Sequence, residues 1–427
     1  MKLFHQKVFY FLCLILVFMM PVFGRILPLI IGLMFLNWLI EGRYITVFRN
    51  LFREKKRIWI LSFSAFYFLY CIGLLYSKNM EYGKFDLQVK LSLFAFPLMF
   101  STIDPGLFSR KNTFILLKTF LGGCVAGSLL FYGHALFNPS PADEYGSFYY
   151  SNLSWFFHPS YLAMYFSFAI SILAYFLLED TKGKNRYKAA LYVFLVFYFL
   201  VFIILLSSKA AILGVITTAL FWISILIFKK RRWKTALGTL LITILSFYAG
   251  LKIFPFATER IAQAKESFQS NIAKAEDLAK KSTSDRISIW KASSEIIRKH
   301  MLYGVGTGDV KDELLKEYKI ENVTEGFQKK LNAHNQYVQT FVALGIIGFL
   351  LLLGMLVLPA WMSIRLEHYL YFSFLLIFGL NIGVESMFET QAGVVFYAFF
   401  NVFLFTGMYF PPVPASGLSE KKTSPPG

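Results

Sequence analysis

The sequence predicts an all-α fold, a polytopic membrane protein of about 12 transmembrane helices with one large helical loop. The first observation is composition: 56% of the 427 residues are hydrophobic and 19% are aromatic. This is more apolar surface than one soluble core could bury. The second observation is that apolar runs of near-spanning length recur along the chain. The alternating ten-residue pattern of an outer-membrane barrel is absent.

The individual spans follow from these apolar runs. The first run, residues 8–40, is too long for one helix, and Pro21, Gly24 and Arg25 interrupt it. We therefore expect two helices there. A cleaved signal peptide is the alternative for the first of them, although no small-residue cleavage site follows. The other spans are predicted at residues 58–76, 91–99, 113–136, 161–178, 189–206, 210–228, 236–253, 337–358, 369–384 and 394–410.

The formal net charge of +18 does not indicate a nucleic-acid partner. Much of the excess of Lys and Arg lies in short loops that alternate with loops poor in basic residues. Such basic loops mark the cytoplasmic side of a membrane protein. We therefore expect both termini in the cytoplasm, the long polar segment on the opposite side, and membrane lipids around the chain. The basic loops are residues 41–57, 105–112, 179–188 and 229–234.

The same pattern divides the chain into four parts. Residues 1–254 are predicted to hold the first nine spans, residues 255–335 a helical loop domain, and residues 336–411 the last three spans. The tail, residues 412–427, is rich in Pro, Ser and Lys and is predicted to be disordered.

The polar segment is predicted to contain three helices. The first, TERIAQAKESFQSNIAKAEDLAKK, is typical of a solvated surface helix. The second begins near Ser284 and Asp285, which are favourable N-cap types. Arg286 and Trp290 lie four residues apart on it and share a face. The third, VKDELLKEYKI, follows the sequence GVGTGD.

GVGTGD, residues 304–309, has two interpretations. It is either a turn with a helix cap or a phosphate-binding loop at a helix N-terminus. It is not a Walker motif, because no Lys follows in register, and the sequence has no DxD motif. The three cysteines lie in apolar runs without metal-ligand spacing. We expect no cofactor and no metal, so the substrate itself must carry the activated group.

His334 directly follows the polar segment, in AHNQYVQTF, where a predicted span begins. Asn335, Gln336 and Gln339 add polar groups at the end of this apolar helix, where burial without a partner is costly. A neutral imidazole at this place could accept a proton from an acceptor hydroxyl. The alternative is a histidine that only satisfies hydrogen bonds at the membrane interface.

Two cationic side chains are candidates for binding phosphate oxygens. Arg286 carries a planar fork that suits them, and its alternative role is an ordinary surface ion pair. Lys209 lies in LLSSKAAIL, a turn between two spans on the predicted outer face. It is either a point charge facing a diphosphate or a lysine that snorkels to the interface.

Other polar residues on that face are weaker candidates. His158, in WFFHPSYLAMYF, opens the sixth span and is either structural or a supporting residue. Trp290 and Asn335 are further candidates for supporting roles. Glu385 and Glu389, in the last outer loop, could supply an alternative base, but nothing in the sequence singles them out.

Four segments, in this order, resemble the O-antigen ligase and Wzy-type polymerase superfamily: SSKAAILG, DRISIW, LYGVGTGD and AHNQYVQTFVALGIIGFLLLL. These motifs cover the second half of the chain, and the succession of spans resembles the family's topology throughout. His334 matches the histidine after the family's loop, and Arg286 matches a loop arginine ahead of a tryptophan. Lys209 falls where the family usually has arginine, so the charge is kept but the bidentate fork is lost.

The resemblance implies a multi-pass enzyme of the bacterial inner membrane whose large loop is periplasmic. It implies a metal-independent glycosyltransferase of lipopolysaccharide biosynthesis. Such an enzyme moves a glycan from undecaprenyl diphosphate to a hydroxyl of a lipid A–core or other glycan acceptor. Under this interpretation Arg286 and Lys209 bind the diphosphate, and His334 and Arg286 are catalytic.

Three alternatives remain open at this stage. A Wzy-type polymerase and a protein O-oligosaccharyltransferase would use the same chemistry on different acceptors. A transporter for lipid-linked sugars belongs to a different class and would need charged residues buried in mid-span, facing a cavity. Lys118, within the fifth predicted span, is the main candidate for such a residue.

Overall fold

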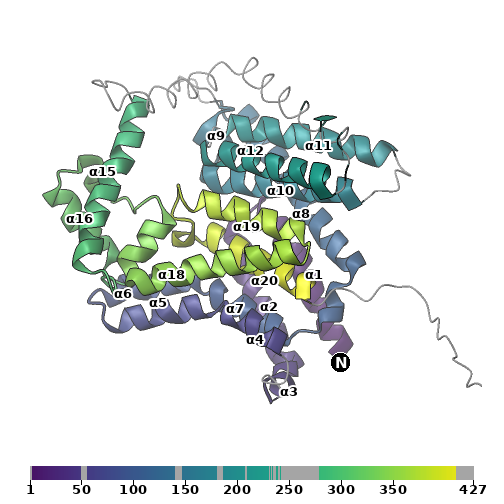
Figure 1. Cartoon of the computed structure of the whole chain (residues 1–427), viewed down its shortest axis with the longest axis horizontal. Helices are drawn as coiled ribbons and strands as arrows, with labels where there is room; N and C mark the ends of the chain where they lie inside the picture. Colours follow the sequence, from purple (N-terminus) through teal and green to yellow (C-terminus); the bar gives the residue numbers. More distant parts are fainter. Residues whose placement is uncertain are drawn as a thin grey trace, which may run out of the picture.

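The computed structural model describes most of the chain as a bundle of helices, and no strand occurs in the part described (Figure 1). The predicted all-α membrane fold is therefore confirmed. Beyond five single positions (231, 233, 237, 238 and 241), the described residues are 2–49, 55–139, 147–179, 186–206, 209–229 and 278–409.

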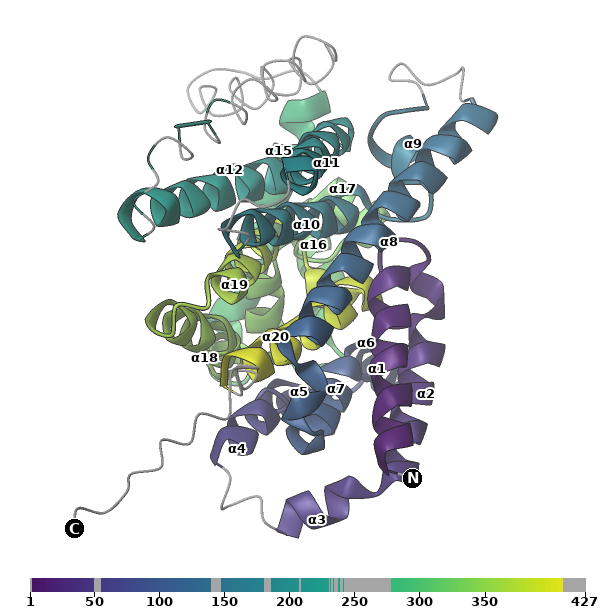
Figure 2. The ribbon, with the colours of Figure 1, turned by 90° about the vertical axis from the view of Figure 1, so that its right-hand side faces the viewer.

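The first apolar run divides where the sequence predicts. α1 (Lys2–Met19) ends before the 3₁₀ turn η1 (Gly24–Ile26), and α2 (Leu27–Glu41) returns beside it. α8 (Arg110–Phe137) lies against α1 (Figure 2). Two glycines spaced four apart on α8, Gly123 and Gly127, allow this close approach. A Cβ atom at either one would lie 2.4 Å from a backbone oxygen of the α1 region, as in the small-xxx-small contacts of membrane helices.

The next part of the chain forms several short helices. After the short α3 (Arg43–Arg49), α4 (Lys55–Ser62) and α5 (Ala65–Leu75) together occupy the third predicted span. α6 (Met80–Lys90) then runs beside α5, and α7 (Ser92–Thr102) continues it. The η3 turn (Pro105–Phe108) leads into α8.

The remaining predicted spans that lie within the described residues correspond to one helix each, except that a π-helical turn completes the eighth. α9 (Tyr150–Ser154) is a short turn of helix before them. The longer helices are α10 (Pro159–Glu179), α11 (Arg186–Leu205), α12 (Lys209–Ser224) with the π-helical turn η4 (Ile225–Lys229), α18 (Gln336–Arg365), α19 (Tyr369–Asn381) and α20 (Gln391–Tyr409), with the turn η5 (Met387–Glu389) before the last.

The core of the bundle lies around α10 and α20, which are the most buried of the candidate spans. α10 packs against α11, α12 and α19, and α20 packs against α7. Aromatic rings fill the space between these helices. Phe168, Phe374 and Phe400 meet with ring centroids 4.9–6.0 Å apart, in tilted or edge-to-face arrangements that stabilise beyond simple burial.

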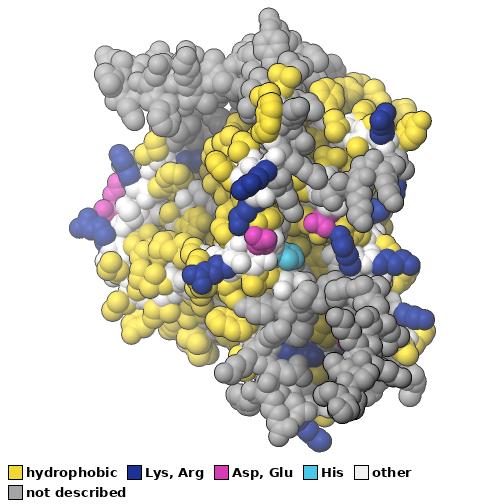
Figure 3. Space-filling view, turned by 45° about the vertical axis from the view of Figure 1, so that its right-hand side comes forward, with side chains coloured by type: hydrophobic (Ala, Val, Ile, Leu, Met, Phe, Trp, Pro, Cys, Tyr) yellow, Lys and Arg dark blue, Asp and Glu magenta, His cyan; other side chains and the backbone are white. Residues whose placement is uncertain are grey.

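Eight helices in the described part are long and apolar enough to cross a membrane, and two more apolar helices, Leu3–Met19 and Tyr369–Asn381, are shorter. Figure 3 shows hydrophobic side chains over broad areas of one face, interrupted by Lys and Arg. The predicted number of twelve stays a prediction, because the ninth predicted span, 236–253, lies almost entirely outside the described residues.

The end of the polar segment forms a compact unit of three helices at one end of the bundle (Figure 1). We call α15 (Leu278–Lys299), α16 (Val310–Ile320) and α17 (Thr324–Gln328) the polar unit. α15 packs against both α16 and α18. The predicted solvated helix upstream of residue 278 and the tail 412–427 lie outside the described residues. The four proposed domain boundaries therefore stay predictions.

A backbone exchange joins the polar unit to α18. α18 is interrupted at Gly345, whose φ of 64° and ψ of −159° are not helical. The N–H of Ile346 donates to Met301 O at 2.9 Å instead of to Val342. The vacated Val342 O accepts from Val305 N at 2.9 Å. Non-helical backbone within an apolar helix is tolerated where the freed groups find partners in the protein, as Ile346 N–H and Val342 O do here.

Candidate functional site

Arg286 lies near the start of α15 and reaches toward the loop between α19 and α20. Its Nη1 donates to Val384 O at 2.8 Å, and its Nη2 lies 3.5 Å from Oε2 of Glu385. Trp290, one turn later, donates its Nε1–H to Ala333 O at 2.9 Å. The four-residue spacing thus brings both side chains to the same side of α15, as the sequence predicts.

His334 occupies a strained position at the junction of the polar unit and α18. Its φ is 46°, a left-handed value that few residues other than glycine adopt. Its N–H donates to Asn332 Oδ1 at 2.9 Å, which stabilises this conformation. Trp290 fixes the residue before His334, because its Nε1–H donates to the carbonyl of Ala333. The imidazole is thereby directed toward the α19–α20 loop, where Nδ1 lies 2.8 Å from Glu385 Oε1.

Glu385 is therefore the point on which Arg286 and His334 converge, one on each carboxylate oxygen. Burial of its carboxyl opposes ionisation, but the hydrogen bond from His334 and the charges of His334, His158 and Arg286 outweigh burial. Together they hold the pKa of Glu385 below the ordinary value of 4.5. The carboxylate is ionised at neutral pH and can orient the imidazole.

The three side chains differ in their access to a ligand. The carboxylate of Glu385 is only 8% exposed, whereas the side chains of His334 and Arg286 are 21% and 34% exposed. The carboxylate is thus the buried part of the cluster, and the imidazole and guanidinium are the parts that a ligand can reach. With Nδ1 directed at the carboxylate, Nε2 is the ring atom left to meet a substrate.

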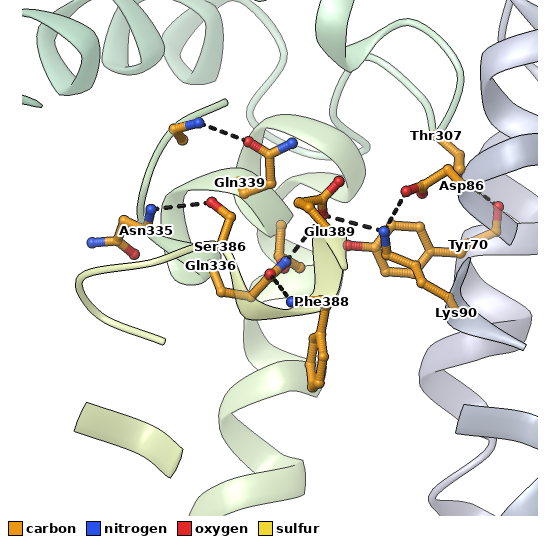
Figure 4. Close-up of polar contacts among 12 residues, drawn as sticks. Tyr70, Asp86, Lys90, Thr307, Asn335, Gln336, Gln339, Ser386, Phe388 and Glu389 are labelled. Atoms are coloured by element: carbon orange, nitrogen blue, oxygen red, sulfur yellow. Dashed lines mark hydrogen bonds and ion pairs between the residues drawn. The ribbon is translucent and has the colours of Figure 1, made fainter. Parts of the chain in front are cut away.

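The residues after His334 hold the same loop in place. Asn335 is the N-cap of α18, because its Oδ1 accepts from Tyr337 N at 2.9 Å and Val338 N at 3.2 Å. Its own N–H donates to Ser386 Oγ at 3.2 Å (Figure 4). Asn335 therefore joins the start of α18 to the α19–α20 loop, and its supporting role at the site stays a prediction.

His158 precedes α10 and lies close enough to Glu385 for its charge to lower the pKa of that carboxyl. Its Nδ1 accepts a hydrogen bond from Ser160 N at 3.3 Å, and its ring makes an edge-to-face contact with Tyr161. His158 therefore influences the electrostatics of the cluster from the segment just before α10.

Lys209 is the first residue of α12, and its side chain lies outside what the structure describes. Its backbone position is nevertheless informative. Gly214 on the same helix faces Asn381 at the end of α19, and Lys209 is five residues, about 7 Å, nearer the helix start. The start of α12 is thus at the end of the bundle where the α19–α20 loop lies.

Residues 304–308 of the GVGTGD segment do not present free N–H groups to a ligand. The N–H groups of residues 304–308 each donate within the protein, to His300, Val342, Ala343, Gly73 and the Ser77 hydroxyl respectively. Asp309 does not cap the helix that it begins, α16. Instead its carboxylate accepts from the backbone of Lys78 and Asn79 at 2.7–2.9 Å. The turn interpretation of this segment is correct, and the cap acts on α6.

A cavity of about 540 Å³ lies at the opposite end of α15, with Tyr76, His300 and Asp309 in its wall. Gly304, Val305 and Asp309 of the GVGTGD segment line it, whereas Arg286 and His334 do not. No group of three or more metal-ligating side chains occurs within the described ranges.

Residues 194–353 match a family model described as O-antigen ligase. The chain carries a domain of the O-antigen ligase superfamily. The match runs from α11 into α18, so it contains Lys209, Arg286 and His334 but not His158 or Glu385. Members of this superfamily are glycosyltransferase-like enzymes and act in a membrane context with lipid-linked glycans. No match was found among curated proteins.

Glu385 lies outside the family match, and the sequence alone did not single it out. It was recognisable only as an acidic residue in a short loop between two apolar spans. Its pairing with His334 and Arg286 bridges 51 and 99 residues of sequence, which no local pattern can indicate.

Proposed function

We propose that the chain transfers a glycan from undecaprenyl diphosphate to a hydroxyl of a lipid A–core acceptor at the periplasmic face of the bacterial inner membrane. The family match supports the reaction class. The observation that carries the proposal is the convergence of Arg286 and His334 on Glu385 at one end of the bundle. On this proposal both termini are cytoplasmic and the polar unit is periplasmic.

In the proposed reaction, the acceptor oxygen forms a bond to the anomeric carbon of the donor sugar. The bond between that carbon and the diphosphate oxygen breaks, and its electron pair leaves with the diphosphate. His334 Nε2 takes the proton from the acceptor hydroxyl, while Glu385 stabilises the imidazolium that forms. No other reactant is needed, because the donor brings its own leaving group.

Arg286 is proposed to meet the diphosphate as charge develops on it. Its guanidinium is partly exposed, and the planar fork suits two phosphate oxygens. Lys209 would add a second positive charge from the start of α12. Its lysine ammonium makes a point contact where arginine would make a bidentate one.

The experiment is a transfer assay with purified protein, lipid-linked glycan and acceptor, without an added energy source. His334→Ala and Arg286→Ala should each lose most transfer, about 100-fold or more for a contact made mainly in the transition state. The matched control is Arg298→Ala, an arginine of the same helix that is 76% exposed and pairs with Glu295. Near-normal transfer by His334→Ala and Arg286→Ala would contradict the assignment.

An experiment in cells identifies the acceptor. A deletion strain that lacks all long glycan on lipid A–core indicates a ligase, and one that retains a single repeat indicates a Wzy-type polymerase. Bare glycoproteins with normal surface glycolipid would indicate a protein O-oligosaccharyltransferase.

A transporter is less well supported. Lys118, its main sequence candidate, is exposed on α8 rather than buried as that role would require. If the purified protein alone transfers glycan to an acceptor, it is not only a transporter. Movement of lipid-linked sugar across a membrane without transfer would favour the transporter.

A further inference from the structure

A second ionic cluster lies beside the loop that carries Glu385. Lys90, the last residue of α6, has a fully buried side chain (0% exposed). Its ammonium pairs with Asp86, one turn earlier, and lies 3.2 Å from Glu389 Oε1 (Figure 4). It also lies 4.7 Å from the ring centre of Tyr70. A buried charge held in this way is strongly destabilised if one partner is removed.

Hydrogen bonds join this cluster to the loop. Glu389 Oε1 also accepts from Gln336 Nε2 at 3.5 Å. Gln336 in turn accepts a hydrogen bond from Phe388 N at 2.7 Å through its Oε1. The residues from Glu385 to Glu389 therefore form one turn, held by the start of α18 on one side and by Lys90 on the other.

We infer that Lys90 is a positioning residue: through Glu389 it fixes the turn that presents Glu385 to the site. The inference rests on the function proposed above. Only three residues separate the two glutamates, so a shift of Glu389 displaces Glu385 with it. A displacement of about 1 Å in a catalytic arrangement can cost roughly 100-fold in rate. Lys90 itself touches no substrate group and acts only through the turn.

The test uses the full-length protein and the same transfer assay. Lys90→Met keeps a long unbranched side chain but removes the positive charge. Glu389→Gln removes the negative charge of Glu389 and keeps an amide that can pair with Gln336. Each should lower kcat by roughly 10- to 100-fold. The double variant should lose no more than the worse single variant, because both changes break one link.

The pH dependence separates positioning from a merely structural role. Three groups lower the pKa of Glu385, namely His334, His158 and Arg286. If the turn moves, these contacts lengthen and the pKa of Glu385 rises. The readout is a pH profile of stability, namely the difference in Tm between a protein and its Glu385→Gln counterpart as the pH is lowered. In the Lys90→Met background this difference should disappear at a higher pH than in the wild type, because the pKa of Glu385 is less depressed. A purely structural loss would lower thermal stability and leave the profile in place.

Lys299→Met is the matched control, since Lys299 pairs with the carboxylate of Glu317 at 2.9 Å within the polar unit and lies 13 residues, about 20 Å, along α15 from Arg286. It should keep the wild-type rate and pH profile. If Lys90→Met does not fold, Glu389→Gln alone decides. Wild-type rate and profile in the folded Lys90 and Glu389 variants would overturn the inference, provided that His334→Ala is inactive. If His334→Ala is also active, the proposed function fails instead.

Discussion

The Nδ1 atom of His334 lies 2.8 Å from Oε1 of Glu385, across 51 residues of sequence. The pair joins the segment just before one apolar helix, α18, to the loop between two others. The carboxylate is 8% exposed and the imidazole 21%. A buried group therefore holds the ring in place, and part of the ring stays accessible. This arrangement resembles a base held by an orienting acid.

The first prediction concerns that orienting acid. Glu385→Gln keeps the shape of the side chain but removes the charge that both His334 and Arg286 contact. We expect transfer to fall by roughly 100-fold, in the range that acid–base contributions span. The measurement is the initial rate with saturating donor. An unchanged rate would show that the imidazole does not need the carboxylate.

The second prediction follows from the pKa of Glu385. Its pKa in the folded protein is lowered below 4.5, so its ionised form stabilises the fold. That contribution is fully present above pH 4.5 and is lost as the pH falls through the lower folded-state pKa. The apparent Tm of the wild type should therefore approach that of Glu385→Gln as the pH is lowered from 6 toward about 3. A constant difference across this range would contradict the shift.

The third prediction tests the interruption of α18. At Gly345 an added Cβ would lie 2.4 Å from the carbonyl of Leu302, and φ is +64°. Gly345→Ala should therefore destabilise the protein by about 1–3 kcal/mol or more, measured as a lower apparent Tm. Gly354→Ala on the same helix is the control, because a Cβ there meets nothing within 4 Å. It should be neutral or mildly stabilising.

The fourth prediction concerns the contact of Asp309 with α6. Its carboxylate accepts from the N–H groups of Lys78 and Asn79, so it acts as a cap supplied from another segment. Asp309→Ala should cost about 0.5–2 kcal/mol, as for other helix caps. Glu313→Gln, on the next turn of α16, breaks only an exposed pair with Lys316 and should leave the Tm unchanged. Equal effects of the two changes would argue against the cap.

Much of the architecture could be predicted from the sequence. Apolar run length and Pro21 with Gly24 predict the division of the first run, and the spacing of Arg286 and Trp290 predicts a shared face. These inferences rest on local periodicity, which the chain obeys. The interruption at Gly345 could not be predicted, because LGIIGFL reads as continuous apolar helix.

The site was predictable only in part, for the same physical reason. Arg286 and His334 stand out because each is polar at the edge of an apolar run. Glu385 and Lys90 acquire their roles from partners far away in the sequence. Lys90 in particular reads as a solvent-facing loop residue, yet it is fully buried.

The exchange of main-chain hydrogen bonds at Gly345 limits how the polar unit can move. Residues 301–308 are anchored to α5 and α18, while Arg286 lies 15 residues before them, in the first half of α15. Rotation of the whole unit as a rigid lid would break several of these bonds at once. Substrate-driven motion would therefore require α15 to bend or its first turns to loosen, with the anchored end as a stationary pivot.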